Sequence, residues 1–138
     1  LILYHFKINK IMKVEVSNGE LLDKLSILEL KMLHIKDKNK LININKEFSE
    51  LKPLANNLFK KYKLEIKNYY LELSKINSKL WKIEDDIREC ERKKDFGKGF
   101  IELARSVYFT NDKRSTVKKA INVLTDSGFV EEKSYEDY

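Results

Sequence analysis

Apolar residues repeat at alternating spacings of four and three from Ala55 to Cys90, and this run constrains the fold more than any other feature of the chain. Its positions are Ala55, Phe59, Tyr62, Ile66, Tyr69, Leu73, Ile76, Leu80, Ile83, Ile87 and Cys90. No Gly or Pro interrupts residues 54–96, so the pattern predicts one continuous helix over about residues 54–92. Such a helix is about 57 Å long at 1.5 Å per residue, and its seven-residue repeat is typical of a coiled coil.

A helix of that length is too long for one small core to cover. It needs a partner, either the other helices of its own chain or a second copy, and we expect a homodimer formed through the long helix. Cys90 lies on the apolar face, which favours a small buried side chain over a nucleophile.

Shorter helical patterns flank the long one. Apolar residues from Leu21 to Ile35 predict a helix that Ser17 or Asn18 caps. A second short helix over about residues 41–51 is expected to end before Pro53, because proline disfavours the helical conformation of the residue that precedes it.

The stretch DFGKGF at residues 95–100 predicts a turn, in which Gly97 and Gly99 supply backbone freedom. A fourth helix is expected from Phe100. Asn111 is expected to cap a fifth helix, and Gly128 to end it.

The sequence therefore predicts an all-α fold, a five-helix arrangement around one long coiled-coil-like helix. The alternating KVEV at residues 13–16 predicts a short N-terminal strand or an extended arm. The length of 138 residues, with one Pro and four Gly, fits a single helical domain over residues 12–138, with a loose acidic C-terminal tail. Residues 1–11 are expected to lie outside the domain, because no periodic face links them to the rest.

Charge and cysteine content narrow the expected partners. The formal charge of +6 is uneven, because residues 1–82 carry 17 basic and 9 acidic side chains whereas residues 83–138 carry 11 and 13. The lysine content reflects composition, since the chain is also rich in Ile and Asn, and we expect no nucleic-acid partner. No apolar run approaches the roughly 20 residues that span a bilayer. The single cysteine favours a reducing, cytoplasmic compartment and, with two histidines, predicts neither a metal site nor a cofactor.

The use of arginine marks the candidate site. All four arginines lie between residues 88 and 114, whereas 20 of the 24 lysines lie elsewhere. Arginine can bind a carboxylate or phosphate through two parallel hydrogen bonds, and it is preferred where a charge is partly buried. If the chain folds back at residues 95–99, its arginines meet acidic and aromatic residues at one helical junction. The predicted binding residues are Trp81, Glu84, Asp85, Arg88, Arg105, Tyr108, Asn111, Asp112 and Arg114.

Three explanations fit this cluster. It can be a buried network of ion pairs that holds the helices in register, a pocket for a carboxylate or phosphate ligand, or a contact surface for another protein. Signatures of known enzymes are missing: the chain has no HExxH, GxSxG, ferritin-type ExxH pair or P-loop.

Three stretches carry a resemblance to a known family. They are VSNGELLDKLSILELK (16–31), LWKIEDDIRECE (80–91) and FIELARSVYFTNDKRSTVKKAIN (100–122). They resemble the domain-of-unknown-function family 6165, a bacterial and viral family, from Met12 to about Tyr135. The resemblance implies no activity.

We therefore expect a non-enzymatic interaction or binding module, whose cluster recognises an anionic group or a protein partner. The alternative is a small all-α enzyme that acts on an anionic carboxylate or phosphate metabolite at the same cluster.

Overall fold

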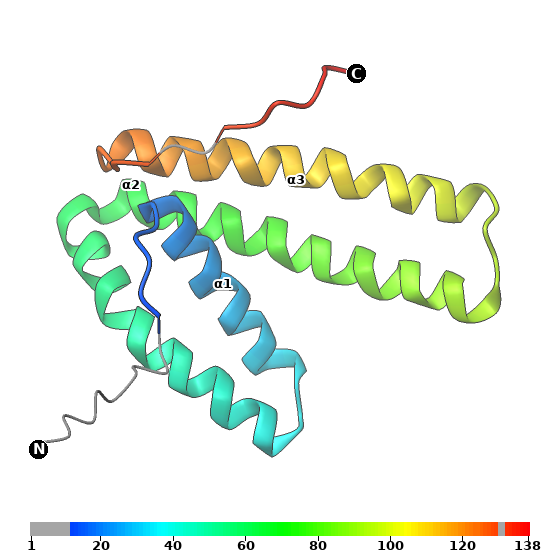
Figure 1. Cartoon of the computed structure of the whole chain (residues 1–138), viewed down its shortest axis with the longest axis horizontal. Helices are drawn as coiled ribbons and strands as arrows, with labels where there is room; N and C mark the ends of the chain where they lie inside the picture. The colour runs from blue at the N-terminus through cyan, green and yellow to red at the C-terminus, as the bar shows by residue number, and fades with distance from the viewer. Residues whose placement is uncertain (1–11, 130–131) are drawn as a thin grey trace, which may run out of the picture.

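The computed structural model describes residues 12–129 and 132–138, and within these ranges the chain forms three α-helices and no strand (Figure 1). The helices are α1 (Asn18–His34), α2 (Lys38–Lys93) and α3 (Lys98–Leu124). The all-α class and the long central helix are confirmed, whereas the predicted number of five helices is wrong. The expectation for residues 1–11 lies outside the described residues.

The second and third predicted helices are one helix, because Pro53 does not end α2. Proline in a helix deprives the carbonyl four residues earlier of its partner, and here that carbonyl belongs to Ser49. Both Pro53 and Ser49 are exposed, so water can satisfy the carbonyl.

The fourth and fifth predicted helices are also one, because Asn111 lies inside α3 and does not cap a new helix. The buried face passes from Val107 through Thr110 and Arg114 to Val117, and the two polar residues hid this continuity in the sequence. The helix ends at Thr125, and the residue with positive φ that follows is Asp126 (φ 48°), not Gly128.

A sharp bend at Lys63 divides α2 into a first limb (residues 38–62) and a second limb (residues 64–93). Lys63 has φ 51° and ψ −126°, which are close to the first central residue of a type II′ turn. The predicted continuous helix is therefore wrong at this position. The apolar repeat runs across the bend without a fault because both limbs turn the same face toward one core. All eleven repeat positions, Cys90 included, are buried or half-buried.

The three helices meet where α1 lies between the two limbs of α2 (Figure 1). On one side the Lys24 ammonium lies 2.5 Å from the Glu47 carboxylate, and on the other the Tyr70 hydroxyl donates to Glu29 over 2.8 Å. The second limb runs beside α3 in the opposite direction (Figure 1). The central core residues are Leu22, Leu25, Ala55, Ile66, Leu73, Val117 and Ile121.

Beyond α1, the second limb and α3 continue as a projection that we call the arm (residues 82–93 and 98–104; Figure 1). The last residue of α1, His34, stacks on Trp81 with ring centroids 4.9 Å apart, which places the base of the arm. The predicted turn at the tip is confirmed, but the positive φ falls on Lys94 (φ 53°) and not on Gly97 or Gly99.

The segments outside the helices are irregular. Residues 13–16 were predicted to form a short strand or an extended segment, and the strand is wrong because these residues form no helix or strand. A lone strand is not stable without a neighbour for its backbone hydrogen bonds, and the described residues offer none. No helix in the described part of the chain is long and apolar enough to cross a membrane.

Candidate functional site

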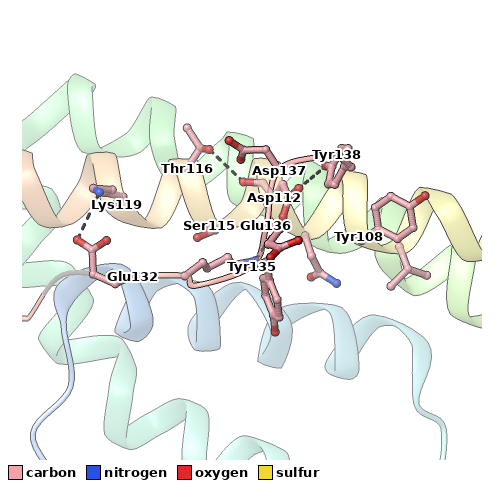
Figure 2. A pocket seen from close by; sticks show the side chains of 13 residues that line it. Tyr108, Asp112, Ser115, Thr116, Lys119, Glu132, Tyr135, Glu136, Asp137 and Tyr138 are labelled. Carbon is pink, nitrogen blue, oxygen red and sulfur yellow. Dashed lines mark hydrogen bonds and ion pairs between the residues drawn. The ribbon is translucent and has the colours of Figure 1, made fainter.

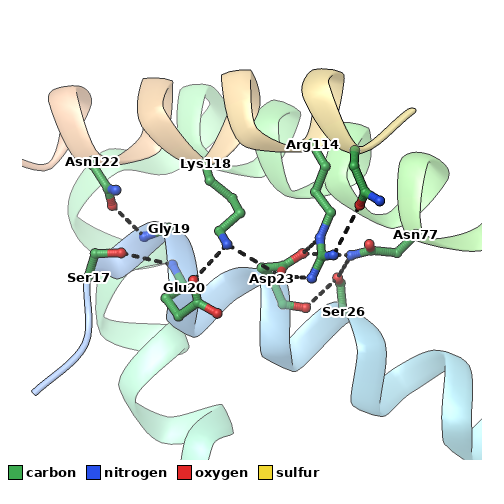
Figure 3. A network of polar contacts seen from close by, with 10 residues as sticks. Ser17, Gly19, Glu20, Asp23, Ser26, Asn77, Arg114, Lys118 and Asn122 are labelled. Atoms are coloured by element: carbon green, nitrogen blue, oxygen red, sulfur yellow. Dashed lines mark hydrogen bonds and ion pairs between the residues drawn. The ribbon is translucent and has the colours of Figure 1, made fainter. Parts of the chain in front are cut away.

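A buried carboxylate, Asp23 of α1, joins all three helices (Figure 3). Its side chain is 1% exposed. Arg114 of α3 donates to both carboxylate oxygens, with Nε 2.9 Å from Oδ1, and Asn77 of the second limb donates to Oδ1 over 2.9 Å. Arg114 therefore uses the two-pronged geometry that distinguishes arginine from lysine.

Further polar groups close the network around Asp23. The Lys118 ammonium lies 2.6 Å from Glu20 Oε2 and 3.9 Å from Asp23 Oδ2. The Asn77 amide also donates to the Ser26 hydroxyl over 2.8 Å, and this hydroxyl donates to the Asp23 backbone carbonyl over 2.8 Å. The buried charges are thus paired and hydrogen-bonded, as a charge removed from water requires.

The start of α1 is bound closely to α3. Ser17 accepts a bond from the Glu20 backbone N–H over 3.1 Å, which confirms one of the two predicted caps. The Gly19 N–H donates to Asn122 Oδ1 over 2.7 Å, and a Cβ on Gly19 would lie 2.5 Å from the Lys118 carbonyl oxygen. Only glycine fits here, because the two helices touch through their backbones.

This network acts as a clamp between helices. Removal of one partner from a buried ion pair leaves an uncompensated charge, so each link holds the register of α1 against the second limb and α3. Its groups are directed at one another and do not surround a cavity (Figure 3).

Most members of the clamp are absent from the predicted site: Glu20, Asp23, Ser26, Asn77, Lys118 and Asn122. One signal was available for Asn77, which belongs to an uncharged stripe on α2 beside the apolar repeat. Asp23 stands between the buried residues Leu22 and Leu25, and a carboxylate at such a position needs a partner.

The nine predicted site residues do not form one cluster. On the arm, Arg88 pairs with Glu84 over 2.7 Å at an exposed position, since the Arg88 side chain is 65% exposed. Arg105 lies over the Phe109 ring at 5.8 Å from its centroid. Trp81 stacks on His34, and Asp85 is exposed. Only Arg114 joins the clamp directly, with Asn111 beside it at 3.5 Å.

A groove beside α3 brings together three of the predicted residues (Figure 2). Its volume is about 1030 Å³, and it lies between α3 and the tail (residues 132–138). Tyr108, Asn111 and Asp112 line it, together with the hydroxyls of Ser115 and Thr116 and the Lys119 ammonium.

The tail is held on this groove by a few polar and aromatic contacts. The Tyr138 hydroxyl donates a hydrogen bond to Asp112, which raises the pKa of Tyr138 to about 12 although the side chain is 74% exposed. The Tyr138 ring meets Tyr108 and Phe109 edge-on, at centroid distances of 5.3 and 5.0 Å. Lys119 lies 3.4 Å from Glu132, and Lys133 lies 3.6 Å from Asp112. Within the described ranges, no group of three or more His, Cys, Asp or Glu side chains is placed to hold a metal ion.

Comparison with known proteins places the chain in a family. No curated protein and no solved structure matches it. A model of the family of unknown function DUF6165 matches residues 12–138. This range contains all three helices and the tail, and it confirms the resemblance that the three sequence stretches indicated. The chain belongs to the family of unknown function DUF6165.

Proposed function

We propose that this protein is a non-enzymatic binding module whose binding surface is the outer face of α3, and that the partner carries an anionic group. The outer face consists of Arg105, Tyr108, Phe109, Asp112, Thr116 and Lys119, which follow one another at helical spacing. The observation that supports the proposal is the groove of about 1030 Å³ beside this face, which the core does not need for its packing.

The chemistry of the outer face suits an extended anionic partner. Arg105 and Lys119 provide cations almost four helical turns, or about 21 Å, apart, since Lys119 follows Arg105 by 14 residues. Tyr108 and Phe109 are exposed aromatic side chains between them, and exposed aromatic and arginine side chains are enriched at protein interfaces.

The enzymatic alternative has less support. An active site for an anionic metabolite needs several cations around one pocket, but Arg114 is bound to Asp23 and Arg88 to Glu84. In the groove, the hydrogen bond to Asp112 raises the pKa of the Tyr138 hydroxyl, away from neutral pH. A general acid or base works best with a pKa near the working pH, so this shift does not favour proton transfer.

A titration of the ¹⁵N-labelled full chain tests the proposal. The probes are inorganic phosphate, citrate and a hexaglutamate peptide, each added to saturation. We expect hexaglutamate to cause saturable shifts in backbone amides between residues 105 and 119. Shifts confined to the arm near Arg88 and Arg92, or no saturable shift with any probe, would contradict the proposed surface.

We also propose that a second copy of the chain docks on the arm. The apolar repeat from Ala55 to Cys90, which suggested a homodimer, packs within the chain against α1 and α3. The arm extends beyond α1 and therefore offers a surface to a second copy. At its tip Phe96 is 49% exposed and Ile101 is 55% exposed. Charges of both signs flank them, which allows two arms to pair.

A cytoplasmic setting also remains a proposal, and it rests on the single cysteine.

A further inference from the structure

The tail shows what kind of segment the outer face of α3 can hold. Its described residues read EKSYEDY and follow a short extended stretch (Figure 2), from which Glu132, Lys133 and Tyr138 contact side chains of α3. The contacts of Tyr138 and Glu132 are those of a peptide lying on a helix surface, and they occur within one chain.

The contacts of Tyr138 with Tyr108 and Phe109 favour an aromatic ring at its position in the bound segment. Tyr138 packs edge-on against both Tyr108 and Phe109, with interplanar angles of 61° and 89°. Edge-to-face pairs are favoured because the positive ring edge meets the negative ring face. A ring at this position therefore contributes attraction that an aliphatic side chain does not reproduce.

The hydrogen bond between Tyr138 and Asp112 favours a tyrosine that carries no phosphate. Asp112 accepts a hydrogen bond from the Tyr138 hydroxyl, and this carboxylate lies beside the position of the hydroxyl oxygen. A phosphate on that oxygen would bring about −1.5 to −2 charges against the carboxylate, and it would remove the donor. The outer face is thus arranged for tyrosine and against phosphotyrosine.

The ion pair with Lys119 favours an acidic residue at the start of the segment, and the next residue, Lys133, pairs with Asp112 over 3.6 Å. Glu132 lies 3.4 Å from the Lys119 ammonium, six residues before Tyr138. The two side chains are 51% and 74% exposed, so the pair is screened and contributes little free energy. It orients the segment and leaves the tail easy to displace.

We propose that the outer face of α3 binds a partner protein through an acidic segment that contains an unphosphorylated tyrosine, and that the tail of this chain is the resident occupant which the partner displaces. This inference rests on the proposed function, because it takes the outer face as the binding surface. A tethered segment acts at an effective concentration on the order of millimolar, so the tail masks the face against weaker partners.

The test uses a fluorescent peptide EKSYEDY, blocked at both ends, and two full-length proteins. One is the parent chain and the other is Glu132→Ala/Tyr138→Ala, in which the tail keeps the Lys133–Asp112 pair but has lost its contacts through Glu132 and Tyr138. We expect the peptide to bind the double variant about tenfold more tightly than the parent, because the weakened tail competes less well for the face. A peptide with phosphotyrosine in place of the last tyrosine should bind the double variant at least about tenfold more weakly, from charge repulsion.

A matched pair of additional substitutions localises the binding. In the double variant, Phe109→Ala should weaken the peptide at least about fivefold, whereas Phe96→Ala, which removes an exposed aromatic at the tip of the arm, should change nothing beyond error. An Asp112→Asn change should reduce the discrimination against phosphotyrosine.

The outcomes separate this inference from the proposed function. If hexaglutamate binds the outer face but the tyrosine peptide binds no better, the inference fails and the proposed function stands. If neither peptide binds the double variant at millimolar concentration, both fail. Equal affinity for the parent and the double variant, or equal affinity of the two tyrosine peptides, also overturns the inference.

Discussion

At the scale of single residues, Arg114 explains why arginine replaces lysine at one position of this chain. Its guanidinium binds both oxygens of the buried Asp23. Lysine offers a point charge on a flexible stem and cannot form the two parallel bonds. We predict that Arg114→Lys lowers the unfolding free energy by about 1–3 kcal/mol, although the charge is kept.

Arg88→Lys is the matched control, because Arg88 pairs with Glu84 on an exposed helix surface. It should change stability by no more than about 0.5 kcal/mol, as for ordinary surface sites. Urea denaturation of the parent and both variants measures the difference. Equal unfolding free energies for the two variants would show that the Asp23 pair does not hold the helices.

A second prediction concerns Gly19. A Cβ there would lie 2.5 Å from the Lys118 carbonyl oxygen, which is backbone and cannot move aside cheaply. We expect Gly19→Ala to lower the unfolding free energy by about 2 kcal/mol, because α1 must move away from α3. At Gly99, in the first turn of α3, an added Cβ would have no atom within 4 Å. Gly99→Ala should therefore raise the unfolding free energy by up to about 1 kcal/mol, because alanine favours the helix more than glycine does. Thermal melts that show the opposite order would contradict the close backbone contact.

The sequence predicted part of the site at this scale. The two-pronged role of arginine holds for Arg114, but Arg88 and Arg92 lie on the arm surface and Arg105 lies on the outer face of α3. The clustering of the four arginines in the sequence could not distinguish Arg114 from the other three. Arg114 differs from them because it binds a buried carboxylate. That carboxylate, Asp23, is 91 residues away in sequence.

At the scale of elements, the bend in α2 decides the architecture. Lys63 adopts φ 51°, a conformation that costs a residue with a Cβ about 1–3 kcal/mol. We predict that Lys63→Gly raises the unfolding free energy by about 1 kcal/mol, because glycine adopts this conformation without the steric penalty. Lys75→Gly, at an exposed and regular position of the same helix, should lower it by about 1 kcal/mol. Equal effects of the two changes in denaturation experiments would mean that α2 is not bent at Lys63.

The sequence predicted the buried faces of the helices, because the apolar pattern determines them. It did not predict where the helices bend or end, because turns determine those positions. The repeat from Ala55 to Cys90 predicted the buried face of α2, and Ser17 predicted the start of α1. The bend could not be predicted, because Lys63 is neither Gly nor Pro and core packing overrides its preference. Pro53 was predicted to end a helix and Asn111 to begin one, but both lie inside helices. Each is tolerated there because the packing of the helix continues on both sides of it.

At the scale of the whole molecule, self-association should depend on the arm and not on the apolar repeat. We expect light scattering at high micromolar concentration to give about twice the chain mass of 16.4 kDa. Ile101→Asp, at the exposed tip of the arm, should return the mass to that of one chain, whereas Leu33→Asp at the exposed end of α1 should not. A single-chain mass for the parent would show that a second copy does not dock on the arm.

The molecule thus divides its polar residues between two tasks. One set is buried between the helices and holds them in register, and the other is spread over the outer face of α3 beneath the tail. We propose that the second set binds the partner.

The affinity for hexaglutamate of two charge-reversal variants tests this claim most directly. Arg105→Glu/Lys119→Glu reverses the outer face, and Arg88→Glu/Arg92→Glu reverses the same number of arm charges. Both variants should melt close to the parent, because the four side chains lie outside the core. We predict that the first weakens binding at least about tenfold and that the second leaves it within about twofold. Binding that survives the first change and is lost with the second would show that the arm, and not the outer face of α3, is the binding surface.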